Sequence, residues 1–257
     1  MTPRTYCAAN TEDLAHVVNI IKGRLPQAPI IGVGVSLGGM QMLNYLARSG
    51  DKSQLEAGMC ISVAWNVFES VESLEKPGLN LHVINRQLSK TLVQMVQRLV
   101  KVKLQMCISV AWNVFESVES LEKPGLNLHV INRQLSKTLV QMSSTIREFD
   151  ERFTSKIFGY DTWQDYYKEA CLHDKIHALK VPVLVLNAAD DPFSPHHAIP
   201  VKEAEENENI AIVVTSHGGH IGFMEGFIPR NSTFMDKLFS QYVKAVVTHG
   251  PTHLKQE

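Results

Sequence analysis

Three short clusters in this sequence have the residue types and the chain order that nucleophilic catalysis requires. The first is Gly34-Val35-Ser36-Leu37-Gly38, in which a serine stands between small residues. The second is the pair Asp190 and Asp191, and the third is Ser216-His217-Gly218-Gly219-His220. A serine hydroxyl becomes a nucleophile when a histidine accepts its proton and a carboxylate orients that histidine. The clusters therefore predict acyl transfer through a serine, a histidine and an aspartate.

The segment around Ser36 is predicted to be a strand, a sharp turn and a helix. Residues 30–35 form an apolar, β-branched run of strand length. An amphipathic stretch through Leu43 and Leu46 follows the serine at helical spacing. The helix would direct its positive N-terminal end toward the place where negative charge develops in acyl transfer.

The glycines of this turn and the residue after Ser36 would each have a specific role. Gly34 and Gly38, two positions either side of Ser36, would let strand and helix approach closely. The backbone N–H of Leu37 would be one donor to the oxyanion. The alternative is a glycine-rich turn without chemistry, because G-x-S-x-G alone is a weak pattern that depends on its strand-to-helix context.

The acid and the base are both expected where buried strands end. Residues 181–186 are typical of a parallel strand, and residues 210–215 are typical of the next one. Such strands place polar side chains at one edge of the sheet, which predicts an α/β fold with a mostly parallel sheet. His220 is then the base. We expect Asp190 to be the acid because it is nearer the strand end, with Asp191 as its competitor.

Four histidines near the predicted site also allow a metal-binding interpretation. They are His196, His197, His217 and His220. None of them stands in an H-x-x-x-H or H-E-x-x-H spacing. We therefore expect no metal and no organic cofactor.

The composition limits the kinds of partner and the cellular compartment that we expect for this chain. The chain has 257 residues, is 44% hydrophobic and carries 25 basic against 26 acidic side chains. This balance gives no electrostatic footprint for nucleic acid. The apolar runs are strand-sized, well short of the ~20 residues of a membrane-spanning helix, and the N-terminus lacks the apolar segment of a signal peptide. The cysteines (Cys7, Cys60, Cys107 and Cys171) show no C-x-x-C or zinc spacing, as expected for a reduced intracellular chain.

The chain contains an exact internal repeat. Residues 59–95 and residues 106–142 are identical letter for letter. Repeat arrays normally need about three or more copies, so two identical copies indicate a duplication and not a solenoid. Only one copy can supply the strand after the helix of residues 37–49. We expect the first copy there, because its connection from that helix is short, and the second outside the sheet.

Several segments of the chain form a set that is more specific than any one motif. They are Arg4-Thr5-Tyr6-Cys7 with residues 9–14, residues 34–39, residues 146–155, Phe158-Gly159-Tyr160, Asp190-Asp191-Pro192-Phe193-Ser194-Pro195 and residues 218–223. Together they resemble the abhydrolase-domain proteins one and three of animals, and the resemblance covers nearly the whole chain apart from the second repeat copy. The resemblance implies the α/β-hydrolase fold with a helical cap, no cofactor, and a nucleophile, acid and base at Ser36, Asp190 and His220.

The same resemblance carries two expectations about organisation. The family has an N-terminal membrane anchor and first sheet strands that this chain would lack, including the loop with a second oxyanion donor. Residues 1–257 would then be one partial domain, with residues 64–150 as a cap that contains the second repeat copy. The protein would be intracellular and membrane-associated, and the anchor or the cap would contact the membrane surface.

The function expected from residues and resemblance is serine ester hydrolysis. The family implies phospholipase-like action on phosphatidylcholines or on medium- and short-chain lipid esters. Two alternatives stay open, a carboxylesterase for small esters and a catalytically inactive binding or regulatory fragment. We also expect the chain alone to be poorly soluble and weakly active, because residues 30–35 would form an exposed edge strand. Adding the family's N-terminal strands would restore both properties.

Overall fold

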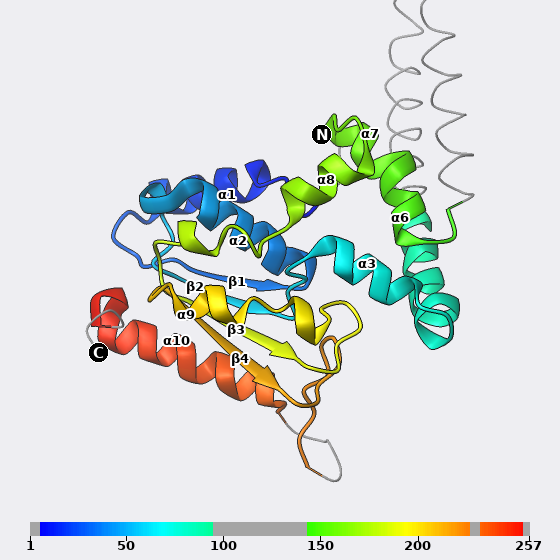
Figure 1. Cartoon of the computed structure of the whole chain (residues 1–257). Coiled ribbons are helices and arrows are strands. Elements are labelled where there is room, and N and C mark those ends of the chain that lie inside the picture. Colours follow the sequence, from blue (N-terminus) through cyan, green and yellow to red (C-terminus); the bar gives the residue numbers. More distant parts are fainter. Residues whose placement is uncertain (1–5, 95–142, 227–231, 254–257) are drawn as a thin grey trace, which may run out of the picture. The chain divides into compact units, whose positions relative to one another are not determined.

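The computed structural model of the chain describes residues 6–94, 143–226 and 232–253. The chain divides into two compact units, one made of residues 6–74 and 166–257 and the other of residues 1–5 and 75–165. The helices include α1 (Glu12–Arg24), α2 (Leu37–Ser49), α3 (Val67–Glu75), α6 (Ile146–Phe149), α7 (Ser155–Phe158), α8 (Trp163–Ala170), α9 (Val201–Glu205) and α10 (Phe234–His253), and the strands include β1 (Ile31–Val35), β2 (Ala57–Ile61), β3 (Val183–Ala188) and β4 (Ile210–Thr215) (Figure 1).

The unit of residues 6–74 and 166–257 is built on a parallel sheet in the order β1-β2-β3-β4. Val35 lies opposite Ile61, and Ile61 lies opposite Leu186. Because all four strands run the same way, their carboxyl ends meet at one edge, which is where open α/β sheets place their ligands. The predicted α/β fold with a parallel sheet is confirmed.

Helices cover both faces of this sheet, as parallel strands require. Figure 1 shows α1 and α2 on one side and α10 on the other. The side chains of β2 alternate accordingly: a Cβ on Gly58 would lie 3.3 Å from Met42 of α2, whereas Met59 and Ile61 pack with Tyr242 and its neighbours on α10. Every residue of β2 is buried.

The repeat expectation is confirmed for its first copy. Residues 59–61 of that copy form most of β2, whose two neighbours in the sheet are β1 and β3. Both edges of β2 are therefore occupied, which leaves no place beside it for a second identical strand. The second copy, residues 106–142, lies outside the described residues.

The unit of residues 75–165 is helical where it is described. Leu92 and Phe153, both partly buried, pack against the buried side chains of Val93 and Phe149. Burial raises the pKa of Glu75, whose carboxylate forms an ion pair with Arg147. The cap boundaries at residues 64 and 150 remain a prediction.

Among the described residues, no helix combines the length and the apolar character needed to cross a bilayer.

Candidate active site

Ser36 lies at the junction of β1 and α2, in the predicted strand-turn-helix arrangement. Its backbone has φ 52° and ψ −120°, a conformation that non-glycine residues rarely adopt and that often marks a functional turn. Its N–H donates to the carbonyl of Ile61 at 2.8 Å. Since α2 begins at Leu37, the Leu37 N–H belongs to the first turn, where helix N–H groups have no acceptor within the helix.

Two glycines of this turn are sterically required, and one of them is not the predicted one. A Cβ on Gly34 would lie 2.5 Å from the carbonyl oxygen of Gly38 and 2.6 Å from the backbone of Gly39. A Cβ on Gly39 would lie 2.8 Å from Val63, but one on Gly38 would meet no heavy atom within 4 Å. The expected need for Gly38 is wrong, because the close approach of strand and helix falls one residue later, at Gly39.

His220 reaches the serine from the turn after β4. Its Nε2 lies 2.8 Å from Ser36 Oγ, as predicted. The preceding Gly219 has φ 56°, a left-handed conformation that glycine adopts at little cost. The hydroxyl of Ser62, the residue after β2, donates to the main-chain carbonyl of His220. The base is thus fixed through both its side chain and its backbone.

The carboxylate that contacts the His220 imidazole is that of Asp191, so the prediction that Asp190 occupies this place is wrong. His220 Nδ1 lies 2.9 Å from Asp191 Oδ2 and 3.1 Å from Oδ1. The Asp191 side chain is completely buried and that of His220 is 17% exposed. Asp191 Oδ1 also accepts the N–H of Phe193 at 2.8 Å. Partners on both oxygens hold this carboxylate in the orientation that a histidine base needs.

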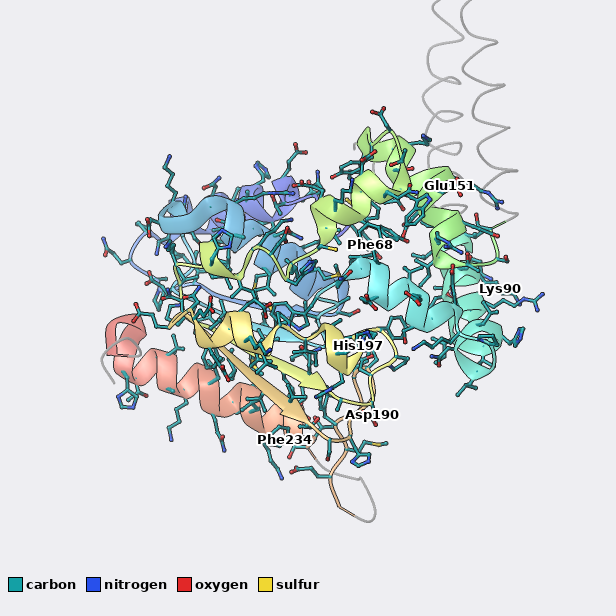
Figure 2. All side chains as sticks on the ribbon, in the orientation of Figure 1. Phe68, Lys90, Glu151, Asp190, His197 and Phe234 are labelled. Atoms are coloured by element: carbon teal, nitrogen blue, oxygen red, sulfur yellow. The ribbon has the colours of Figure 1, made fainter. Side chains whose placement is uncertain are left out.

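Asp190 contacts the same turn in a different way. It lies past the end of β3, is exposed (Figure 2), and its Oδ1 accepts the N–H of Gly219 at 2.8 Å. The chain turns after Ala188, whose carbonyl accepts the Asp191 N–H, so the two aspartates point in different directions. Distance from the strand end therefore did not identify the acid. The Asp-Pro-Phe order did carry a signal, because aspartate favours a bond to the N–H two residues on.

Two further side chains at the site had no signal in the sequence. The ring of Phe193 stacks on the His220 imidazole, with centroids 4.1 Å apart and planes at 28°. Ser62 approaches His220 across 158 positions of sequence. Neither contact follows from local spacing, since both partners are brought together only by the sheet.

Two of the other histidines of the metal interpretation contact separate partners. His197 lies 3.0 Å from Glu69, and His217 lies 3.0 Å from Ser216. Among the described residues, no three His, Cys, Asp or Glu side chains gather as metal ligands would.

Behind the turn that carries Ser36 lies a buried thiol. Cys60 is fully buried in β2 and its Sγ lies 3.6 Å from the Gly39 carbonyl oxygen. Burial raises the pKa of this thiol far above its usual range, so it stays protonated at neutral pH. Of Ser36 and Cys60, only the serine has an imidazole nitrogen of the described residues against its side-chain atom.

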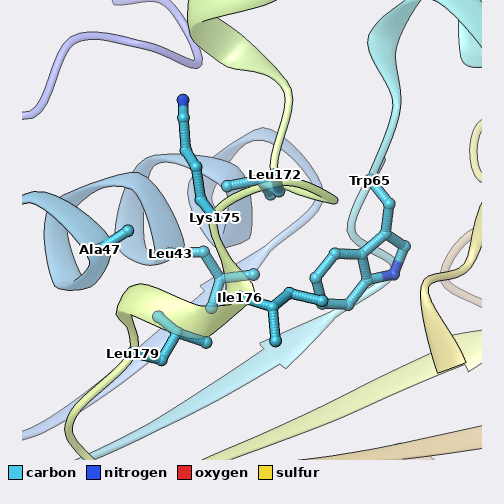
Figure 3. Close-up of a pocket in the computed structure, with 7 residues that line it drawn as sticks. All are labelled: Leu43, Ala47, Trp65, Leu172, Lys175, Ile176 and Leu179. Carbon is cyan, nitrogen blue, oxygen red and sulfur yellow. The ribbon is translucent and has the colours of Figure 1, made fainter. Parts of the chain in front are cut away.

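An apolar hollow in the same unit is separate from these residues. Figure 3 shows its lining, which is Leu43, Ala47, Trp65, Leu172, Lys175, Ile176 and Leu179. Lys175 donates to Asn44 at 2.9 Å, and burial lowers the pKa of its ammonium. Ser36, Asp191 and His220 do not line this hollow.

Comparison with known proteins agrees with the strand order and the turn geometry. A family model described as the alpha/beta hydrolase fold matches residues 2–227. The chain belongs to the α/β-hydrolase fold family. As an α/β hydrolase, it presents Ser36 after β1, Asp191 after β3 and His220 after β4, the chain order of serine, aspartate and histidine in this fold.

Relatives within the α/β-hydrolase family include named lipid hydrolases. The chain is 44% identical to human "Phospholipase ABHD3" over 97% of its own length and 54% of that protein. It is 32% identical to "Protein abhd-3.2" of Caenorhabditis elegans, over 94% of this chain and 56% of that one. It also resembles the solved esterase Pf2001 of Pyrococcus furiosus, with a TM-score of 0.46, 12% identity and coverage of 95% and 64%. The chain therefore spans about half the length of the curated relatives it matches.

Proposed function

We propose that this chain is a serine hydrolase that cleaves carboxylic ester bonds of lipids. The observation that carries the proposal is the continuous chain of contacts from Asp191 through His220 to Ser36, at 2.9 and 2.8 Å. Both distances lie within the range expected for a nucleophile, its base and the residue that orients the base.

In the first half of the reaction, Ser36 Oγ attacks the ester carbonyl carbon and His220 Nε2 accepts the hydroxyl proton. The carbonyl oxygen becomes an oxyanion beside the N–H of Leu37 at the start of α2. His220 then returns its proton to the alkoxide, which leaves as an alcohol, and the acyl group remains on Ser36. Asp191 holds the imidazole tautomer and stabilises its charged form throughout.

In the second half, a water molecule replaces the alcohol. His220 removes a proton from this water, the resulting hydroxide attacks the acyl carbon, and Ser36 recovers its proton from His220 as the carboxylic acid is released. The two halves use the same base and the same oxyanion position. The residues named here are sufficient for these proton transfers.

The lipid part of the proposal is supported by the relatives and not by a binding site. Human and mouse relatives are named "Phospholipase ABHD3" and "Monoacylglycerol lipase ABHD2". We therefore propose phosphatidylcholines and other lipid esters as substrates. A membrane surface is the proposed place of action, reached by the cap region or by an N-terminal anchor of the kind the family carries.

Covalent labelling with a fluorophosphonate probe tests the proposal directly. The probe phosphonylates serines that are activated by a base, so the chain should be labelled at Ser36 and Ser36→Ala should not. Asp191→Asn should label about 10⁴-fold more slowly, because an amide stabilises the wrong imidazole tautomer. Asp190→Asn should label within a few-fold of the unmodified chain, since its amide oxygen can still accept the Gly219 N–H.

Two controls make this result decisive. Circular dichroism melts establish that each variant is folded, and hydrolysis of phosphatidylcholine, monoacylglycerol and a p-nitrophenyl ester identifies the substrate class. A folded chain that is not labelled at Ser36 contradicts the enzyme proposal. Labelling with hydrolysis of the small ester alone supports the carboxylesterase alternative instead.

A further inference from the structure

Phe193 contacts both partners of the proposed acid–base pair. Its ring stacks on the His220 imidazole at a centroid distance of 4.1 Å, and its backbone N–H donates to Asp191 Oδ1 at 2.8 Å. The imidazole has Ser36 at one nitrogen and Asp191 at the other, so both of its polar edges are occupied. The Phe193 ring covers one of its two faces.

The segment that carries Phe193 is held at its other end by a buried polar network. Asn187, near the end of β3, donates to Ser194 Oγ at 3.1 Å and to the carbonyl of Val63 at 3.1 Å. The Trp65 indole donates to the Asn187 amide oxygen at 3.1 Å. Asn187 and Ser194 are fully buried and Trp65 is almost so, so loss of any of these bonds would leave a buried polar group unpaired.

Backbone chemistry adds to this rigidity. Phe193 lies between Asp191-Pro192 and Ser194-Pro195, and each proline ring fixes its own φ near −65°. The two prolines therefore limit the backbone conformations open to the segment that carries Phe193. The charged groups bonded to the facing turn are Asp191, on the imidazole, and Asp190, on the Gly219 N–H.

We propose that Phe193 is a positioning residue for His220, whose ring keeps the imidazole in the plane that joins Asp191 to Ser36. This inference rests on the proposed function for its catalytic consequence. An aromatic face also stabilises the imidazolium that forms when Ser36 loses its proton, as aromatic rings do for other organic cations. Phe193 itself touches no reacting atom.

The test compares Phe193→Leu with Phe193→Tyr and with a matched control, Phe68→Leu. Leucine keeps the backbone N–H and most of the volume but removes the aromatic face, which tyrosine retains. Phe68 is partly buried in the same unit and makes an edge contact with the ring of Tyr167, with centroids 5.5 Å apart. Each variant is prepared with ¹⁵N- and ¹³C-labelled histidine, and His220→Gln assigns the His220 signals.

The first readout is nuclear magnetic resonance and does not depend on activity. Stacking should shift the His220 ring C–H protons upfield, and the Nδ1–H held by Asp191 should exchange slowly with water. Phe193→Leu should abolish the upfield shift and speed this exchange, Phe193→Tyr should restore both, and Phe68→Leu should change neither. An unchanged His220 spectrum in a folded Phe193→Leu chain overturns the proposal.

The second readout measures the consequence for catalysis. Phe193→Leu should lower kcat for a soluble ester about three- to ten-fold with KM unchanged, and should slow Ser36 labelling by the same factor. Tyrosine should recover most of the rate. If the magnetic resonance changes occur as expected but Ser36 is never labelled in any variant, the proposed function fails while the positioning contact stands. If Phe68→Leu produces the same losses, the effect is general destabilisation and the proposal is wrong.

Discussion

The strands β1 and β2 lie side by side in the sheet, and each is followed directly by a serine with a positive φ. Ser36 has φ 52° and Ser62 has φ 54°. Each donates its N–H to a carbonyl of the neighbouring strand, Ser36 to that of Ile61 at 2.8 Å and Ser62 to that of Leu186 at 2.7 Å. The same residue type in nearly the same turn is thus present twice at one sheet edge.

The two turns differ in the element after the serine and in the group that faces its hydroxyl. A helix begins directly after Ser36, whereas the chain after Ser62 continues to α3 at Val67. Ser36 Oγ lies against the His220 imidazole, but Ser62 Oγ, fully buried, lies against the His220 carbonyl. A strained serine is therefore not enough for a nucleophile. An accessible hydroxyl, a helix N-terminus and an imidazole nitrogen must meet at it.

The largest expected effect is the difference in activity between substitutions of Ser36 and of Ser62. Ser36→Ala should remove fluorophosphonate labelling and lower esterase activity by about 10⁶-fold, as loss of a nucleophilic serine does elsewhere. Ser62→Ala removes one hydrogen bond to the His220 backbone, worth about 1 kcal/mol, and should slow labelling about five-fold. Labelling rates measured on both variants check this. Equal losses in the two would show that Ser62 belongs to the chemistry.

The next prediction compares Val33 with Met59, which face each other across β1 and β2. Val33 is 48% exposed and Met59 is 0% exposed. Met59→Lys buries an unpaired ammonium and should unfold the unit, whereas Val33→Lys should change the free energy of unfolding by no more than about 0.5 kcal/mol.

Thermal melts and soluble yield measure both effects of this pair. Val33→Lys should also raise the soluble yield, because a lysine on an edge strand discourages pairing with another chain. A Val33→Lys chain that melts as early as Met59→Lys would contradict the difference in exposure.

A smaller difference is expected between substitutions of Gly34 and of Cys60, which lie opposite each other in β1 and β2. Gly34→Ala forces a Cβ against the backbone of Gly38 and Gly39, and should cost about 3 kcal/mol and slow labelling of Ser36. Cys60→Ala removes only a buried thiol and should cost about 1 kcal/mol with labelling preserved. Urea unfolding and labelling rates distinguish the two. A normally labelled Gly34→Ala chain would show that helix and strand can separate without loss of the site.

The smallest expected effect concerns alkylation of the Cys60 thiol. Burial raises its pKa, so the thiolate is scarce at pH 8, and raising the pH to 9 should still give little reaction. Iodoacetamide should leave Cys60 unmodified in the native chain and should not slow Ser36 labelling. After denaturation Cys60 should react within minutes, as mass spectrometry of its peptide would show. Rapid native alkylation would indicate that β2 opens easily.

Local patterns in the sequence were sufficient for some of these features. The turn at Ser36 was predictable because strand, glycine and helix signals follow one another within residues 30–46, and His220 was predictable from its strand-end position. The choice between Asp190 and Asp191 was not, because one residue reverses the direction of a side chain in a turn. The roles of Gly39, Phe193 and Ser62 depend on which atoms the sheet brings together, and no spacing along the chain encodes those distances.

The position of the repeat boundary within β2 has a consequence for how the chain folds. Two identical segments could in principle compete for one place between β1 and β3, giving two folded isomers with long loops exchanged. The strand, however, begins at Ala57 and Gly58, just upstream of the duplicated residues. At the equivalent positions before the second copy stand Leu104 and Gln105. Ala57 is 0% exposed and a Cβ at Gly58 would already lie 3.3 Å from Met42, so these larger side chains would not fit. Ala57 and Gly58 lie outside the repeat and thus make its two copies unequal. Only the first copy is preceded by residues small enough for a strand beside β1.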